Sequence, residues 1–409
     1  MSSSASTPQI FATALGLHDP WQVVDTQFDR DAGQLTLTVD FVRGARFACP
    51  DCGAAGCPVH DTQPRQWRHL NFFQYACYIQ ARQPRVTCDH CGVKAIPVPW
   101  ARPGSGFTLL FEAFVLTLMQ DMPVRAVSDW VGEWDTRLWR VLAHYVTAAR
   151  DQRSLAAVTG FGVDETAARR GHHDVTLFVD PAESAVMFAT PGKDATTVTR
   201  FAADFQARGG TPDAVTDVTM DMSPAFIKGV TSQFPHAAIT FDKFHVMKLL
   251  GDAVGAVRRA ERKERPELAG SRYLWLKNPQ HLKPTAAAAL ATLRRAHLKT
   301  GRAYAIKETL QGFWDQPPEE AEAFLQKWYW WATHSRLDPI RQAAKTIKAH
   351  WAGVLQYVQS HRTNAVLEGI NSLVQAAKSR ARGYRNVHHF IQVIYLMAGK
   401  LTLPRLTLG

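Results

Sequence analysis

The sequence of 409 residues lacks any apolar run of the roughly 18 residues that a membrane helix needs. Its N-terminus, MSSSASTPQIF, has neither the basic nor the apolar segment of a secretory signal. Acidic residues are in the minority, with 36 Asp and Glu against 47 Lys and Arg and a net charge of +11. These absences disfavour a membrane or secreted protein. They predict a cytoplasmic protein with a polyanionic partner, most simply nucleic acid.

Cysteine is scarce, with six residues in all, yet four of them form two similar motifs. The segments are CPDCG at residues 49–53 and CDHCG at residues 88–92. Each is a tight turn that directs two thiolates at one point, and two such turns complete a tetrahedral site typical of zinc. A redox CxxC pair is the alternative, but it lacks a thioredoxin-like βαβ context. We therefore expect a zinc ribbon with one structural zinc ion, bound by Cys49, Cys52, Cys88 and Cys91.

A linker rich in Pro and Gly at residues 97–106 precedes three stretches with helical periodicity. They are residues 107–120, 123–131 and 134–150. A short helix, a turn containing Gly132 and a helix with a basic face are typical of a helix-turn-helix, whose last helix enters the major groove of DNA. A small helical bundle with a solvated face is the alternative, and the preceding zinc ribbon favours DNA. The expected DNA-binding residues of the last helix are Arg137, Arg140 and His144.

The middle of the chain changes to strand-like periodicity. Three expected antiparallel strands between residues 155 and 190 are followed by a helix, by a strand rich in β-branched residues at 215–220 and by a short apolar strand at 237–241. Asp221 and Asp242 stand where these last two strands end. This order predicts a ribonuclease-H-like fold, whose first acid lies midway along its first strand, where Asp164 stands.

Residues 251–360 carry helical periodicity without a strand signal, and a further helix is expected within residues 361–386. Its apolar stripe is expected to comprise Val366, Ile370, Leu373, Val374 and Ala377. The opposite face is expected to present Glu368 among three amides, Asn364, Asn371 and Gln375. A basic run follows that could hold DNA phosphates, made of Lys378, Arg380, Arg382 and Arg385. An ordinary polar helix surface with a basic end is the alternative.

The fold class expected is multidomain α+β, with a small zinc ribbon, a helix-turn-helix domain and a ribonuclease-H-like α/β catalytic core interrupted by an all-helical insertion. The expected boundaries are an N-terminal segment at 1–46, the zinc ribbon at 47–100, the helix-turn-helix domain at 101–155, the first part of the core at 156–250, the insertion at 251–359 and the C-terminal helical part of the core at 360–409.

Taken together, these segments resemble the ISL-three insertion-sequence family of DDE transposases over nearly the whole chain. Besides the cysteine motifs, the resemblance is carried by PWARP at 99–103, GVDE at 162–165, RGH at 170–172, DMSP at 221–224, FDKFHV at 241–246, EGIN at 368–371 and GYRN at 383–386. It implies a catalytic triad of Asp164, Asp221 and Glu368 that binds two magnesium ions, with manganese as a substitute. The accessory candidates are Asp242, His245, Asn364 and Asn371, and a structural role stays open for the first two.

The activity implied by this resemblance is DNA transposition in the bacterial cytoplasm, at the nucleoid. The protein would bind terminal inverted repeats, cleave them by two-metal catalysis and transfer the freed ends to target DNA. Two copies would be needed to bring two ends together. Two alternatives remain open: a catalytically inactive, transposase-derived DNA-binding regulator, and a ribonuclease-H-like nuclease without strand transfer.

Overall fold

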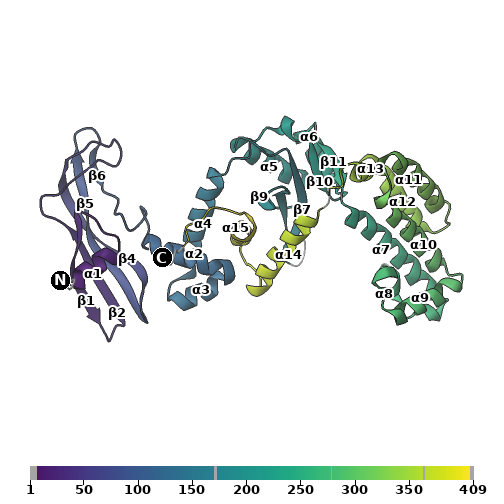
Figure 1. The fold of residues 1–409 in the computed structure, drawn as a ribbon, viewed down its shortest axis with the longest axis horizontal. Helices are drawn as coiled ribbons and strands as arrows, with labels where there is room; N and C mark the ends of the chain where they lie inside the picture. Colours follow the sequence, from purple (N-terminus) through teal and green to yellow (C-terminus); the bar gives the residue numbers. More distant parts are fainter. Residues whose placement is uncertain (1–6, 170–172, 278, 363, 406–409) are drawn as a thin grey trace, which may run out of the picture. The chain divides into compact units, whose positions relative to one another are not determined.

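The computed structural model describes residues 7–169, 173–277, 279–362 and 364–405, and the chain divides into two compact units (Figure 1). The first unit comprises Met1–Thr147 with Thr402–Gly409, and the second comprises Ala148–Leu401. The RGH motif at 170–172 lies outside the described residues. Within the described part of the chain, no helix is long and apolar enough to cross a membrane.

The first unit contains a six-stranded sheet in the order β1-β2-β5-β4-β3, with β6 also paired to β5. The strands are β1 (Trp21–Asp29), β2 (Gln34–Phe41), β3 (Arg46–Phe47), β4 (Cys57–Phe72), β5 (Tyr75–Cys88) and β6 (Gly92–Ala95). The N-terminal strands β1 and β2 form an antiparallel hairpin. Its second strand runs parallel to β5, so the N-terminal strands extend the sheet of the long β4–β5 hairpin. Three tryptophans, Trp21, Trp67 and Trp100, meet edge to face in the core of this sheet.

Three helices confirm the pattern expected after the linker. They are α2 (Leu109–Asp121), α3 (Val124–Val131) and α4 (Asp135–Gln152). The hydroxyl of Thr108 begins α2 by accepting a hydrogen bond from the backbone N–H of Phe111. Gly132 ends α3 at φ 71°, a left-handed conformation that glycine adopts without strain.

The second unit is built on a five-stranded sheet in the order β11-β10-β7-β8-β9. The strands are β7 (Gly160–Arg169), β8 (His173–Asp180), β9 (Ala185–Pro191), β10 (Asp217–Met220) and β11 (Ala238–Phe241). The first three form the expected antiparallel meander, and β10 and β11 run parallel to β7. One face of the sheet packs Phe161 against Phe201 of α5 (Ala195–Ala207). On the other face, Leu367 of α14 (Ala365–Arg380) lies directly over Gly162.

Helices alone follow β11 in the described residues up to Ser360, as expected. They are α7 (Lys243–Glu261), α8 (Arg272–Leu276), α9 (Pro284–Arg295), α10 (Lys299–Gln311), α11 (Pro318–Thr333), α12 (Asp338–Ala349) and α13 (Trp351–Ser360), joined in part by short 3-10 turns. Glu261 connects α7 to α10, because its carboxylate accepts hydrogen bonds from the backbone N–H groups of Lys299 and Thr300. After α14, the chain ends with α15 (Val387–Ala398).

Candidate functional site

Three acids stand at one level of the sheet in the second unit. Gly162 of β7 pairs with Thr219 of β10, which pairs with Thr240 of β11. Asp164, Asp221 and Asp242 each lie two residues after these paired residues in the sequence. Because paired residues of parallel strands project to the same face, these acids are carried side by side toward the face that α14 covers. The prediction from the strand ends therefore agrees with the observed register.

The charges at this level influence one another. Burial raises the pKa of Asp164, and the carboxylates of Asp221 and Asp242 raise it further, whereas the Glu165 amide and the charge of His245 lower it. The pKa of His245 is raised, first by its hydrogen bond to Asp242 at 3.2 Å and then by the nearby charges of Asp242, Asp221 and Asp164. The three carboxylates therefore form an acidic cluster, and the imidazole of His245 lies beside it.

Asp164 and Asp221 are each held by a backbone amide. Asp164 accepts a hydrogen bond from the N–H of Glu165 at 2.8 Å, and Asp221 accepts one from the N–H of Ser223 at 2.9 Å. Ser223 is the N-cap of α6 (Pro224–Gln233), and Pro224 is the first residue of that helix. The side chain of Ser223 makes no cap hydrogen bond, so its contribution at this point comes from the backbone.

Helix α14 is fastened to β7 by polar side chains. Asn371 Nδ2 donates to Asp164 Oδ2 at 2.6 Å, and one turn later Gln375 Nε2 donates to Thr166 Oγ1 at 2.7 Å. Lys378 Nζ then donates to the carbonyl oxygen of Ala167. Asp164 and Thr166 are two residues apart on β7 and so share one strand face, whereas Ala167 is contacted through its backbone. They fix where α14, and with it Glu368, stands on the sheet.

The expected faces of α14 require a correction. Its buried residues are Leu367, Ile370, Val374 and Ala377, whereas Leu373 is 39% exposed. The amides expected opposite the apolar stripe partly face β7, because the sheet offers Asp164 and Thr166 as hydrogen-bond acceptors. Asn364 is 2% exposed, and neither polar atom of its side chain has a hydrogen-bond partner in the described structure.

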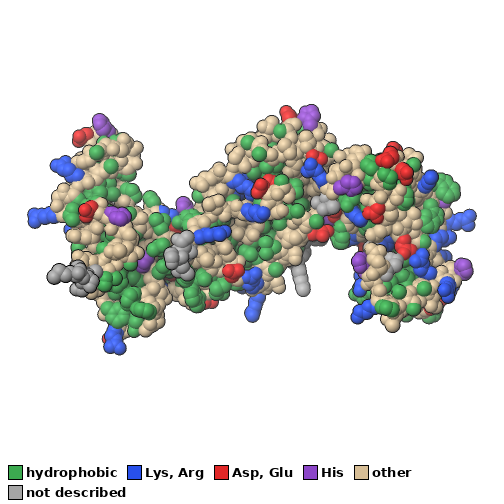
Figure 2. Space-filling view, in the orientation of Figure 1, with side chains coloured by type: hydrophobic (Ala, Val, Ile, Leu, Met, Phe, Trp, Pro, Cys, Tyr) green, Lys and Arg blue, Asp and Glu red, His purple; other side chains and the backbone are tan. Residues whose placement is uncertain are grey.

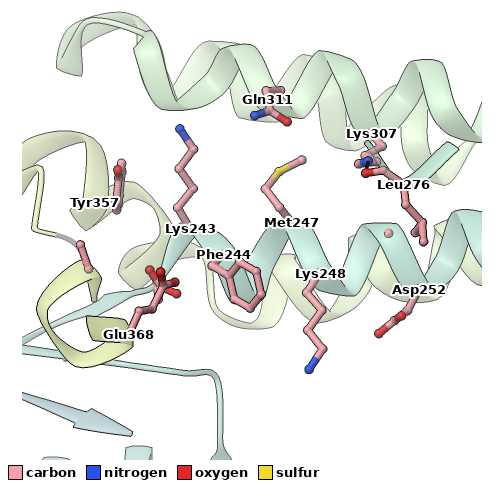
Figure 3. Close-up of a pocket in the computed structure, with 13 residues that line it drawn as sticks. Lys243, Phe244, Met247, Lys248, Asp252, Leu276, Lys307, Gln311, Tyr357 and Glu368 are labelled. Carbon is pink, nitrogen blue, oxygen red and sulfur yellow. Dashed lines mark hydrogen bonds between the residues drawn. The ribbon is translucent and has the colours of Figure 1, made fainter. Parts of the chain in front are cut away.

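Glu368 lies in the first turn of α14, is exposed, and lines a pocket together with Asp242 (Figure 3). Among the residues that the structure describes, only the four cysteines place three or more metal-ligand atoms within 4.8 Å of one another. The carboxylates of Asp164, Asp221 and Glu368 therefore do not converge as closely as the thiols do. Oxygen ligands nonetheless match the preference of magnesium.

The four cysteines of the first unit form a compact ligand set. Their sulfur atoms all lie within 4.8 Å of one another, and Sγ of Cys52 lies 3.6 Å from Sγ of Cys88. Tetrahedral zinc at about 2.3 Å from each sulfur requires sulfur separations of about 3.8 Å. The backbone N–H groups of His90 and Cys91 lower the pKa of Cys88 to about 6, whereas the hydrogen bond with Cys52 raises the pKa of Cys91 to about 12. The donor set therefore fits a structural zinc ion.

The candidate DNA-binding residues differ in their surroundings. Arg140 and His144 are exposed on α4. Arg137 is instead engaged within its own unit, where it donates to Glu133 and stacks 4.1 Å from the ring centroid of Phe107. Lys378 is likewise used against β7. Beyond it Arg380, Arg382 and Arg385 are exposed.

The basic composition does not by itself locate a DNA-binding surface. On the face shown in Figure 2, Lys and Arg side chains are spread over both units rather than gathered into one patch. Individual side chains must therefore be tested.

Comparison with known proteins covers both units. A family model described as a transposase matches residues 161–394, the helix-turn-helix domain of transposase family ISL3 matches 96–146, and the zinc-finger of transposase IS204/IS1001/IS1096/IS1165 matches 45–91. The transposase for insertion sequence element IS1557 of Mycobacterium tuberculosis is 27% identical over 97% of both chains. That for IS1001 of Bordetella parapertussis is 26% identical over 92% of this chain and 95% of its own. The resemblance found in the sequence is thus confirmed, and the chain belongs to the ISL3 family of insertion-sequence transposases.

Proposed function

We propose that this chain is a DDE-type transposase that cleaves the ends of its own element and joins them to target DNA. The observation that carries the proposal is that Asp164 on β7 and Asp221, directly after the adjacent parallel strand β10, lie at one level of the sheet beneath the helix that bears Glu368. In-line displacement at phosphorus requires such a group of acids and no covalent protein intermediate. These three residues are the proposed catalytic triad.

We infer further that the second unit has a ribonuclease-H-like core. The supporting features are the antiparallel meander, the following helix α5, and two strands that extend the sheet in parallel on the side of β7. The all-helical segment then lies between the second acid and Glu368. In this arrangement the insertion separates Asp221 from Glu368 in the sequence, and α14 brings Glu368 back to the sheet.

The triad is proposed to hold two magnesium ions, with manganese as a substitute. Two divalent ions would activate the attacking oxygen and stabilise the leaving oxygen. The protein's part is to keep the ligands charged and oriented: amides hold Asp164 and Asp221, and Asn371 fixes the second oxygen of Asp164. Positive charge would offset the repulsion that contributes to the raised pKa of Asp164.

The accessory residues are proposed to position DNA. The hydrogen bond to Asp242 raises the pKa of His245, and in its protonated form this side chain would attract the phosphate. Asn364 has unpartnered amide atoms at the start of α14. The exposed residues Arg140 and His144 would contact the terminal inverted repeats, and two copies of the chain would bring two ends together.

Cleavage of labelled DNA tests the proposal. The full-length protein, incubated with magnesium and a duplex that carries the element's end, should nick at the repeat boundary and join the end to a target plasmid. Cleavage without joined product would indicate a nuclease without strand transfer. Absence of both products, with end binding retained, would indicate a regulator and contradict the proposed activity.

Replacing Asn371 tests whether this residue orients the carboxylate of Asp164 or only helps to dock α14 on β7. Asn371→Leu removes the hydrogen bond to Asp164, so we expect the cleavage rate to fall about 10–100-fold, as is typical when a partner of a metal ligand is lost. Gln375→Leu is the matched control, since Gln375 fastens the same helix to Thr166 one turn away. Equal rate losses in the two variants would mean that Asn371 acts only by docking α14.

Arg140→Ala should weaken recognition of the terminal repeats. If the exposed guanidinium reads a base, affinity should fall by about 1–3 kcal/mol for the repeat and much less for unrelated DNA. Fluorescence anisotropy with both DNAs measures the difference, and Arg82→Ala, in the sheet of the same unit and paired with Asp40, is the control. Equal losses on both DNAs would assign Arg140 to phosphate contacts instead.

A further inference from the structure

Positive charge is distributed unevenly along the chain. Residues 258–302 contain 12 Lys and Arg but three Asp and Glu, so this stretch holds +9 of the net charge of +11. It runs from the last turn of α7 through α8 and α9 to the first turn of α10, all within the helical insertion. A local excess of one sign of charge raises the concentration of oppositely charged ligands there. The insertion is therefore the part of the chain to search for an anion site.

A cavity of about 570 Å³ lies inside this stretch, where α9 ends and α10 begins. Its lining is dominated by exposed side chains that carry or can carry positive charge: Arg294, His297, Lys299 and Arg302. The remaining lining residues are Leu298, Gly301 and Ala305. No carboxylate is among the lining residues, so this α9–α10 cavity is cationic.

The local sequence explains why the cavity forms. His297 has a φ of 52°, and this left-handed residue turns the chain after α9. Leu298 follows and is buried, which anchors the start of α10 in the core. Gly301 and Ala305 stand one turn apart on one face of α10 and contribute no bulky side chain. The space above that face is therefore left open between the longer basic side chains.

The nearby carboxylates have partners of their own. Glu308 pairs with Arg294 at 3.2 Å. Glu261 of α7 accepts hydrogen bonds from the backbone N–H groups of Lys299 and Thr300, each at 2.7 Å. The side chains of Lys299 and Arg302 form no ion pair with any residue that the structure describes. Their charges are therefore available to a ligand.

We propose that the α9–α10 cavity binds a phosphate group, held by Lys299 and Arg302 with His297 beside them. A guanidinium group donates paired hydrogen bonds to phosphate oxygens, and an ammonium group adds a compact point charge. The phosphate belongs to the backbone of DNA or to a free phosphorylated small molecule, since both offer the same chemistry. The site goes beyond the proposed catalysis, because it uses neither the strand-end acids nor magnesium.

Gly301→Asp tests the site without damage to the fold. A Cβ added at Gly301 meets no atom closer than Cα of Arg294 at 4.0 Å, and an acid in the first turn of a helix favours that helix. Equilibrium dialysis of the full-length protein against labelled inorganic phosphate measures binding. We expect Gly301→Asp to weaken it by at least about tenfold, because like charges repel. Gly301→Asn, which has the same shape without the charge, should retain it.

The dependence of DNA affinity on sodium chloride identifies the source of the phosphate. If DNA supplies it, Lys299→Ala combined with Arg302→Ala should make the plot of log affinity against log salt shallower by about 0.9, the value for one lost phosphate contact. Affinity for the element's end and for an unrelated duplex should fall by the same factor, because phosphate contacts carry no sequence information. Lys327→Ala combined with Lys345→Ala is the control, since these exposed residues of α11 and α12 lie outside the cavity.

The two measurements decide between the sources and against the site. A shallower salt dependence in the cavity variant alone assigns the phosphate to DNA. Loss of inorganic phosphate in Gly301→Asp with an unchanged salt dependence assigns it to a free phosphorylated molecule. The proposal is overturned if neither loss occurs, or if Gly301→Asn and the α11–α12 control lose as much as the cavity variants. Neither measurement requires cleavage, so failure of the proposed catalysis would leave this inference standing.

Discussion

Asp221→Asn is expected to reduce cleavage of the element's ends by at least about 1,000-fold, which corresponds to about 4 kcal/mol of lost transition-state stabilisation. The substitution keeps the shape of the side chain but removes a negative charge between Asp164 and Asp242 on the sheet. Binding of the ends should persist, because the helix-turn-helix belongs to the other unit. Denaturing gels for cleavage and anisotropy for binding measure the two effects separately.

Asp217→Asn is the matched control for this experiment. Asp217 lies on β10 four positions before Asp221 and forms an ion pair with Arg362 at 3.1 Å. Its loss should alter stability slightly and leave chemistry in place, since partly exposed ion pairs contribute little. If Asp221→Asn retained magnesium-dependent cleavage, or if both variants lost it equally, the triad assignment would be wrong.

Cys49→Ser should abolish zinc binding and destabilise the first unit. Structural zinc contributes about 10–16 kcal/mol of binding free energy in small metal sites, which is comparable with the whole stability of a domain. We expect bound zinc to fall from about one ion per chain to nearly none. End binding should be lost as well, because backbone hydrogen bonds join Arg68 of β4 to Gly106 and Thr108 at the start of α2.

Cys77→Ala tests whether the effect belongs to the metal site. Cys77 is buried on β5 but lies outside the cluster of four sulfurs, and burial raises its pKa to about 11. This variant should keep its zinc, as measured by atomic emission on anaerobically purified protein. Zinc retained by Cys49→Ser, or absent from the unaltered chain, would contradict the ribbon.

The strand-end acids could be anticipated from the sequence because their positions follow from local rules. A β-branched run closed by an acid indicates a buried strand with a charged end, and parallel strands place such ends at one edge. The cysteine motifs could be predicted in the same way. Gly53 and Gly92, at φ 74° and 72°, permit the tight turns that bring the thiols of each motif together. In both cases each individual pattern lies within a few residues along the chain, although the sheet and the paired turns bring the separate patterns together.

The surroundings of Arg137 and Lys378 could not be anticipated in this way. Both are basic residues on helices whose spacing indicates a solvated face, yet one pairs with Glu133 and Phe107 and the other with the carbonyl of Ala167. A helical wheel gives the faces of a helix but not the strand on which it docks. The pocket that Asp242 and Glu368 line was hidden for the same reason, because its residues are brought together only by tertiary packing.

The parallel pairing of β2 with β5 has a practical consequence for work with fragments. A piece cut to the matched zinc-finger residues, 45–91, would omit β1 and β2 and leave β5 with an unpaired edge where Leu35 and Leu37 now pair with Cys77 and Ile79. Such exposed edges promote aggregation by pairing with other chains. A fragment intended for spectroscopy should therefore begin before Trp21, so that it brings its own edge strands with it.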